Sequence, residues 1–234
     1  MAGIAHSVAL EGLVGRPVEV EVDVSSGMPG TIVVGLGDTI VSEARERVRA
    51  AVINSGVAWP EHRVAINLAP STLPKSGSHY DLAMALAVVA AKRAISSDQL
   101  AGTAYVGELA LDGRLRAVRG VLPATLAAAE AGFESIVVPE VNVPEARLVP
   151  GIRVVGARSL RQCLARVTGE PEPDDPEVPP LDDSSGTTAW GGVGDRVGLD
   201  LADVAGQEDT RTAVIVAAAG GHHLLMTGPP VSVQ

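Results

Sequence analysis

Cysteine and aromatic residues are scarce in this sequence, and each scarcity limits the structure and chemistry that it can support. The single cysteine, Cys163, excludes an internal disulfide framework. We interpret Cys163 as a small buried apolar residue rather than as a catalytic thiol. Aromatic residues make up 2% of the chain, although 46% of it is hydrophobic. The core must therefore be built from alanine, valine, leucine and isoleucine.

Long hydrophobic runs and a recognisable leader are also missing. The longest apolar run, Leu82 to Ala91, is far shorter than the roughly 18 residues that a membrane span requires. The start, MAGIAHSVAL, lacks the basic region and the long apolar stretch of a secretory signal. The sequence therefore predicts a soluble, cytoplasmic protein.

Basic residues are absent from one stretch, and this absence divides the chain. Residues 1–166 carry 16 acidic and 16 basic side chains, so the net charge of −10 originates elsewhere. Residues 167–195 carry eight acidic side chains, five prolines and no basic residue. Such a composition buries too little apolar surface to order itself, and it extends by self-repulsion. We therefore predict a domain over 1–166, a disordered acidic linker over 167–196, and a short C-terminal piece over 197–234.

Hydrophobic periodicity predicts that the first part is a mixed α/β (α+β) domain. The run Val18 to Val24 alternates valine with acidic residues, which is typical of a strand with one wet face. The segment from Asp81 to Ala94 is apolar nearly all round and predicts a central buried helix. Strands come first and alternate with helices later, so the sheet is expected to be mixed. We expect residues 3–166 to fold alone.

The remaining elements follow from turn residues and spacing. Asp38 is a candidate N-cap for the helix in DTIVSEARERVRAAVINSG, and a turn is expected at Asp112-Gly113. Further strands are expected in HSVALEGL, GTIVVGL, RVAINLAP, TAYVGELA, GRLRAV, SIVVP and GIRVVGA, and further helices in GVLPATLAAAEAGF and SLRQCLARV.

Three segments carry a resemblance to a known family: VGLGDTIVSEARERVRAAVINSGVAWP, INLAPSTLPKSGSHYDLAMALAVVAA and VGELALDGRLRAVRGVLPA. In this order they look like the N-terminal domain of the Mg-chelatase-like AAA+ ATPases, the group that includes the competence protein ComM. The likeness covers nearly all of residues 3–166. It resumes at LDLADVAGQEDTRTAVIVAAAGGHHLLMTGPP, which resembles the start of that family's AAA+ module. The resemblance implies the fold of the second domain of ribosomal protein S5, shared with the Lon protease domain, with its left-handed βαβ crossover.

The likeness to Lon raises the question of peptidase activity, which the residues at two positions answer. Lon-type peptidases pair a serine nucleophile with a lysine that lowers the proton affinity of the serine. In this sequence His79 stands at the nucleophile position and Leu122 stands at the lysine position. Ser76 and Ser78 are nearby hydroxyls that we interpret as turn or cap residues. We therefore predict no catalytic residue and no peptidase activity.

Other candidate chemistry is weaker still. His222 and His223 are adjacent on a predicted strand and point to opposite faces, so we predict no metal site. The arginines at 45, 47 and 49 could meet phosphates, but Glu43–Arg47 and Glu46–Arg49 have the spacing of helix-surface ion pairs. The domain has no net positive charge and few aromatics, so unaided binding of nucleic acid is weakly supported.

The last part resembles the beginning of a nucleotide site. The resemblance implies that Val204, Gly206 and Gln207 frame an adenine pocket, and that Gly228, Pro229 and Pro230 begin a phosphate-binding loop. That loop requires G-x-x-x-x-G-K-[ST], but the chain continues VSVQ, without the lysine and the Mg²⁺-binding hydroxyl. We expect a truncation, by a frameshift after Pro230 or by deliberate shortening. ATP and Mg²⁺ are the cofactors of the intact family, and none is expected in this chain.

The same fragment predicts little order of its own. We expect a helix over roughly residues 207–219 and a strand over 223–227. One helix and one strand cannot close a core, so we expect this part to be poorly ordered or loosely docked.

Two hypotheses for the function remain. The first is a truncated ComM-like ATPase, whose intact family forms a ring that moves DNA with ATP during branch migration in natural transformation. The second is a free-standing, non-catalytic interaction domain with the S5-like fold. A downstream reading frame encoding G-x-G-K-T would favour the first hypothesis.

Overall fold

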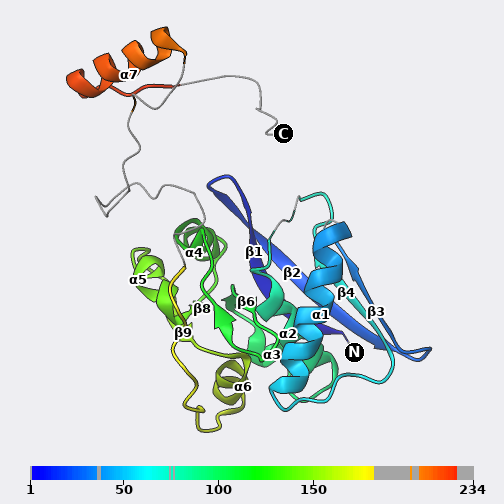
Figure 1. Ribbon diagram of the computed structural model, residues 1–234. Coiled ribbons are helices and arrows are strands. Elements are labelled where there is room, and N and C mark those ends of the chain that lie inside the picture. Colours follow the sequence, from blue (N-terminus) through cyan, green and yellow to red (C-terminus); the bar gives the residue numbers. More distant parts are fainter. Residues whose placement is uncertain are drawn as a thin grey trace. The chain divides into compact units, whose positions relative to one another are not determined.

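The computed structural model describes residues 2–35, 38–73, 75, 77–181, 201 and 206–225. The chain forms two compact units, Met1–Asp182 and Asp183–Gln234, which are described separately (Figure 1). Within the described residues, no helix is long and apolar enough to cross a lipid bilayer.

The first unit is built on a mixed seven-stranded sheet in the order β3-β4-β2-β1-β5-β8-β9. The pairs β1–β2 and β2–β4 are antiparallel, whereas the other pairs are parallel. The sheet therefore has the mixed character that the sequence predicts. Its strands are β1 (Gly3–Glu11), β2 (Val14–Ser25), β3 (Gly30–Val34), β4 (Arg63–Ala69), β5 (Thr103–Tyr105), β8 (Ser135–Pro139) and β9 (Arg153–Ala157).

Helices cover both faces of this sheet. The main core lies on one face, beneath α1 (Asp38–Asn54), α2 (Asp81–Ala91) and α6 (Leu160–Thr168). A smaller core lies on the other face, beneath α4 (Val121–Glu130) and α5 (Val143–Ala146). Strand β1 contributes to both cores, because Ala9 packs in the main core and its neighbour Val8 in the smaller one. The helices α1, α2 and α6 lie in front of the sheet in Figure 1.

Helix α2 is the centre of the main core, as its sequence predicts. Every residue from Asp81 to Ala90 is buried. The helix ends at Ala91 rather than at the expected Ala94, because Arg93 takes a positive φ of 61° just after it. Gly3 of β1 allows a close approach, since a Cβ atom there would lie 2.0 Å from the Ala87 carbonyl oxygen. The fit between α2 and β1 therefore depends on a residue without a side chain.

Strands β6 (Glu108–Leu109) and β7 (Leu115–Arg116) form a separate two-stranded ribbon. The turn between them lies at the predicted Asp112-Gly113, where Gly113 has a φ of +86°. The sequence did not predict three short elements: α3 (Ser97–Leu100), the 3-10 helix η1 (Glu140–Asn142) and α5. They contain too few residues to show helical periodicity.

Residues 170–181 differ from the disordered linker that the sequence predicts, and we call them the acidic strap. Asp175 is 3% exposed and Val178 is 7% exposed, and Val178 packs in the main core. The strap is held by α6 and the turn before it. Arg166 bonds Glu172 through Nε at 2.8 Å, and Gln162 donates to the carbonyl of Pro173 at 3.0 Å. The prediction from composition fails here because arginines elsewhere in the fold pair with three of the five acidic side chains of the strap. Residues 182–196 of the predicted linker lie outside the described residues.

The second unit contains α7 (Glu208–Gly220), close to the helix expected over residues 207–219. None of the residues of this helix is buried. The helix stops at Gly221, which takes a left-handed φ of 63° and turns the chain away. The strand expected over 223–227 is absent from residues 222–225, where the chain has no regular structure, and Met226 and Thr227 lie outside the described part.

Candidate functional site

The loop between β4 and α2 carries the polar residues that invited comparison with a peptidase. Lys75 is buried, with 6% of its surface exposed. Its Nζ donates to the carbonyl oxygens of Pro70 at 2.5 Å and Leu73 at 3.1 Å. Burial lowers the pKa of this amine. The ammonium therefore holds the loop backbone together.

The hydroxyl and the imidazole of the same loop are also occupied. Ser78 Oγ donates to the carboxylate of Glu108, which also lies 3.6 Å from Arg116 Nη1. His79 Nε2 donates to the carbonyl of Val8 at 3.1 Å, and its ring lies 4.0 Å from that of Tyr80. Burial lowers the pKa of His79, and the bond to Val8 opposes that shift. These contacts fix the loop against β1 and β6.

Leu122, at the position of the Lon-type lysine, lies in the first turn of α4. Its backbone N–H donates to Glu145 at 2.9 Å, and its side chain is partly exposed. In the loop, Ser78 bonds a carboxylate and Lys75 bonds carbonyls, so these two groups are not engaged as a hydroxyl–ammonium pair. Ser76 lies outside the described residues. The lack of peptidase activity stays a prediction, and this geometry supports it.

A buried ion pair lies next to this loop, at the start of α2. The Asp81 carboxylate is fully buried and accepts from Arg47 Nε at 2.8 Å and from the Leu109 N–H at 3.3 Å. Burial raises the pKa of Asp81 to about 6, and the bonds from Arg47 oppose that shift. Arg47 also makes the predicted pair with Glu43, at 3.6 Å. The contact with Asp81 was missed, because sequence spacing reveals pairs within a helix but not pairs between helices.

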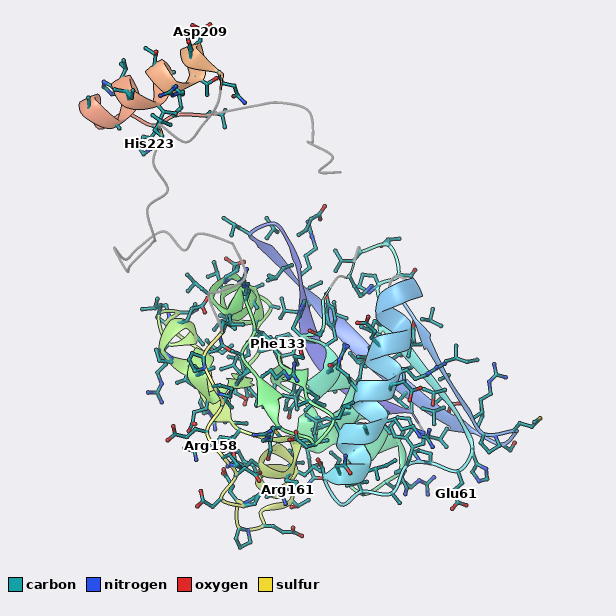
Figure 2. The ribbon with its side chains drawn as sticks, in the orientation of Figure 1. Glu61, Phe133, Arg158, Arg161, Asp209 and His223 are labelled. Carbon is teal, nitrogen blue, oxygen red and sulfur yellow. The ribbon has the colours of Figure 1, made fainter. Side chains whose placement is uncertain are left out.

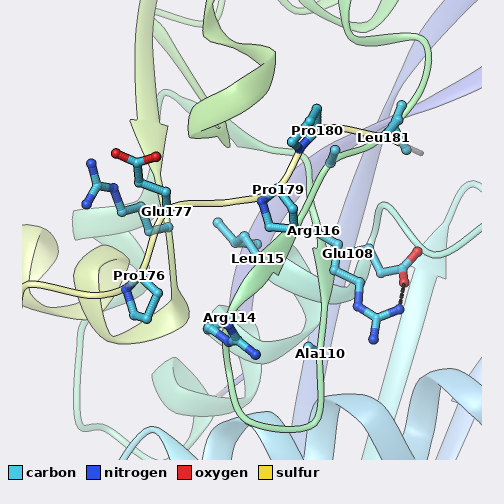
Figure 3. A pocket seen from close by; sticks show the side chains of 12 residues that line it. Glu108, Ala110, Arg114, Leu115, Arg116, Pro176, Glu177, Pro179, Pro180 and Leu181 are labelled. Carbon is cyan, nitrogen blue, oxygen red and sulfur yellow. Dashed lines mark ion pairs between the residues drawn. The ribbon is translucent and has the colours of Figure 1, made fainter. Parts of the chain in front are cut away.

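A pocket of about 440 Å³ lies between the β6–β7 ribbon and the acidic strap (Figure 3). Pro176, Pro179 and Pro180 of the strap form its apolar wall. The cations that line it are all paired. Arg114 bonds Asp112, Arg116 faces Glu108, and Arg158 bonds Glu140 at 2.7 Å. Because each of these arginines already has a partner, the pocket offers little free positive charge to a ligand.

The residues predicted for a nucleotide site belong to the second unit, and only two of the six are described. Gly206 and Gln207 both take left-handed backbone conformations, with φ of 72° and 52°, just before α7. The carbonyl of Gln207 accepts from the N–H of Arg211 at 2.9 Å. Val204, Gly228, Pro229 and Pro230 lie outside the described residues. Within the described ranges, no group of three or more His, Cys, Asp or Glu side chains is placed to hold a metal ion.

Comparisons with known proteins match both parts of the chain. The family model described as subunit ChlI of Mg-chelatase matches residues 20–142, and a second model, magnesium chelatase subunit ChlI, matches residues 200–233. The chain is 48% identical over 228 residues to the uncharacterized protein Rv2897c of Mycobacterium tuberculosis. It is 37% identical over 227 residues to the competence protein ComM of Haemophilus influenzae. Each alignment covers 97% of this chain and 43% of the relative. The chain thus spans less than half the length of these relatives.

A shorter match supports the predicted fold. The chain is 32% identical over 157 residues to the Lon protease of Mycolicibacterium smegmatis, covering 63% of this chain and 20% of that protease. Together with the mixed α/β sheet, this match confirms the Lon-like fold class that the sequence predicts.

Proposed function

Because the chain belongs to the Mg-chelatase-like ComM family, we propose that it forms the N-terminal part of an AAA+ ATPase that moves branched DNA with ATP. One observation carries this proposal. The two family matches, at residues 20–142 and 200–233, fall in the two compact units, which divide at Asp182. An N-terminal domain followed by the beginning of an ATPase module is the arrangement expected of this family.

Within this proposal, the first unit is an interaction module rather than an enzyme. Its loop lysine, serine and histidine each bond groups of the same domain, and its ion pair Arg47–Asp81 is internal. A self-contained domain with two cores also suits a free-standing interaction domain. The two proposals make different predictions: a domain of the ATPase supports DNA movement when it is joined to an ATPase module, whereas a free-standing interaction domain does not.

The residues of this chain do not by themselves fit ATP and Mg²⁺. The 234 residues contain no G-x-x-x-x-G-K-[ST] sequence, so the lysine and hydroxyl that hold the phosphates and the metal are not supplied. In the proposed protein, ATP is therefore bound and hydrolysed by the full ATPase module, of which this chain carries only the beginning. A ring of such subunits would surround DNA.

A chimera tests this proposal in vitro. Residues 1–227 of this chain would replace the matching segment of Haemophilus influenzae ComM, leaving the rest of that protein intact. We expect the purified chimera to assemble and to move a branched DNA junction in the presence of ATP and Mg²⁺. ComM that lacks the replaced segment is the control, because it shows how much of the DNA movement depends on that segment. A chimera that assembles and hydrolyses ATP, but moves no junction, would contradict the proposal and favour a free-standing interaction domain.

A further inference from the structure

A hollow of about 680 Å³ lies at the β3 edge of the first unit, away from the loop and the ion pair described above. It is formed where α1, the start of β3 and the loop before β4 meet. Glu61, one of its residues, is labelled near the lower end of α1 in Figure 2. The residues that line it are Pro29, Gly30, Thr31, Arg45, Glu46, Arg49, Trp59, Pro60 and Glu61.

The three arginines of α1 face different surroundings, a difference that the sequence did not show. Arg47 turns inward to the buried Asp81, whereas Arg45 and Arg49 line the hollow. Arg45 Nε lies 3.2 Å from a carboxylate oxygen of Glu46. The predicted Glu46–Arg49 pair is therefore replaced by an Arg45–Glu46 pair. Arg49 is exposed and has no ion pair with any described residue, so its guanidinium is available to a ligand.

Trp59 supplies an aromatic surface in the same hollow. It is partly buried and packs against the main core, which fixes the position of the indole. Pro29 and Pro60 also line the hollow and are conformationally rigid. Few aromatic residues are present in this chain, so an aromatic ring and an unpaired arginine in one hollow distinguish this surface as a candidate binding site.

We propose that this hollow binds one nucleotide of a single-stranded nucleic acid, with the base stacked on Trp59 and the phosphate against Arg49. Stacking on an aromatic ring tolerates any base, and a guanidinium matches the geometry of phosphate oxygens. The Glu61 carboxylate, which makes no ion pair with any described residue, is placed to accept from the amino group of a base. A volume of about 680 Å³ lies in the range of small-ligand sites. This inference rests on the proposed DNA-moving function.

The charge balance of the hollow favours one nucleotide of a strand over a free nucleoside triphosphate. Two arginines and two glutamates line it, and one arginine is already paired. A nucleoside triphosphate carries several phosphates and needs more than one unpaired cation, whereas one nucleotide within a strand presents a single phosphate. Stacking rather than a general positive field therefore dominates the attraction. The salt dependence is expected to be shallow, with a slope of about −0.7 in log K against log salt for one phosphate.

Intrinsic fluorescence of the 234-residue chain tests the site directly. The chain has two tryptophans, so Trp190→Phe leaves Trp59 as the only indole emitter. We expect a ten-residue deoxycytidine oligonucleotide to quench Trp59 saturably, and deoxycytidine triphosphate to compete much more weakly. Equal competition by the triphosphate would show a free-nucleotide site and would overturn the proposal of a strand.

Variants assign the binding to the hollow. By anisotropy of a labelled oligonucleotide, we expect Trp59→Ala to weaken binding at least about fivefold, the lower end of the stacking contribution to affinity. Arg49→Ala should weaken binding several-fold and flatten the salt dependence. Arg153→Ala is the matched control, because Arg153 is an exposed arginine on β9, at the opposite edge of the sheet.

Thermal unfolding of Trp59→Ala shows whether weaker binding reflects a folding defect or the lost contact with the base. Arg49→Ala is the second, independent variant, because the exposed Arg49 side chain can be removed with little effect on folding. No saturable binding up to about 1 mM oligonucleotide, or equal affinity in all three variants and the parent, would overturn the inference. This result is independent of the chimera. If the chimera moves DNA but the hollow binds no oligonucleotide, only the proposed binding site is refuted, and the proposed function stands.

Discussion

At the residue scale, Asp81 shows how burial and a partner oppose each other. Its carboxylate has lost all contact with water, which disfavours the charged form, while Arg47 and the N–H of Leu109 bond that same form. Burial prevails, and the pKa rises to about 6. In the unfolded chain the same group has its ordinary value of 3.8. The native state therefore binds more protons than the unfolded state between these two values.

From this difference we predict that the contribution of Asp81 to stability falls as the pH rises from about 4 to about 6. The free energy of unfolding of the parent, relative to that of Asp81→Asn, should fall across this range by on the order of 2 kcal/mol. Urea unfolding of both proteins at several pH values measures it. A difference that stays flat would show that Arg47 fully offsets burial, and one that grows with pH would show that Arg47 outweighs it.

Asp112→Asn is the matched control for this experiment, with the opposite sign. Burial, the largest single effect, raises the pKa of Asp112, but the hydrogen bonds and charge of Arg114 together hold that pKa below its usual value. Its contribution is present above the unfolded pKa and is lost as the pH falls. Relative to Asp112→Asn, the stability of the parent should therefore rise with pH in the acid range.

At the element scale, the contact of α2 with β1 depends on Gly3. A Cβ atom at residue 3 would lie 2.4 Å from the Ala91 nitrogen and closer still to the Ala87 carbonyl, both in the helix backbone. We predict that Gly3→Ala lowers the free energy of unfolding by about 1–3 kcal/mol, because backbone atoms must move.

Gly30→Ala is the control for Gly3→Ala, since a Cβ at residue 30 would meet nothing nearer than 3.9 Å. It should change stability by less than about 0.5 kcal/mol. Equal losses for the two variants in urea unfolding would contradict the packing of α2 against β1 described above.

The acidic strap provides the second prediction at this scale. Asp175 is buried between Ser159 and Arg161, whereas the side chain of its neighbour Asp174 is fully exposed. Asp175→Ala should cost about 1.5–3 kcal/mol, the range for hydrogen bonds to a charged group, and should speed amide exchange over residues 172–178. Asp174→Ala should leave both unchanged. Similar behaviour of the two variants would indicate that the strap contributes nothing to the domain.

Much of the fold could be predicted from periodicity, because strands and helices longer than one turn show their buried faces in the sequence. The alternation in Val18 to Val24 and the apolar run of α2 are examples. The strap could not be predicted, since Arg158, Arg161 and Arg166 pair with three of its acidic side chains, and these arginines meet the strap only in the folded domain. The hollow was missed for the same reason, because Trp59 and Arg49 become neighbours only through the loop before β4.

At the scale of the whole molecule, the chain divides at Asp182 into two compact units. The 234 residues lack the lysine of a phosphate-binding loop, so we predict that this polypeptide alone releases no phosphate from ATP above background. A Mg²⁺-dependent phosphate-release assay checks this, with intact ComM as the positive control. Turnover that survives further purification would contradict the assignment of ATP chemistry to an adjoining module.

The central claim is that this chain forms the N-terminal part of a DNA-moving ATPase. The most direct measurement is the frequency of natural transformation by chromosomal DNA in Haemophilus influenzae cells whose only ComM is the chimera carrying residues 1–227 of this chain. The account predicts a frequency close to that of cells with their own ComM, and well above that of cells lacking it. A frequency equal to that of cells lacking ComM, from a chimera present at normal levels, would contradict it.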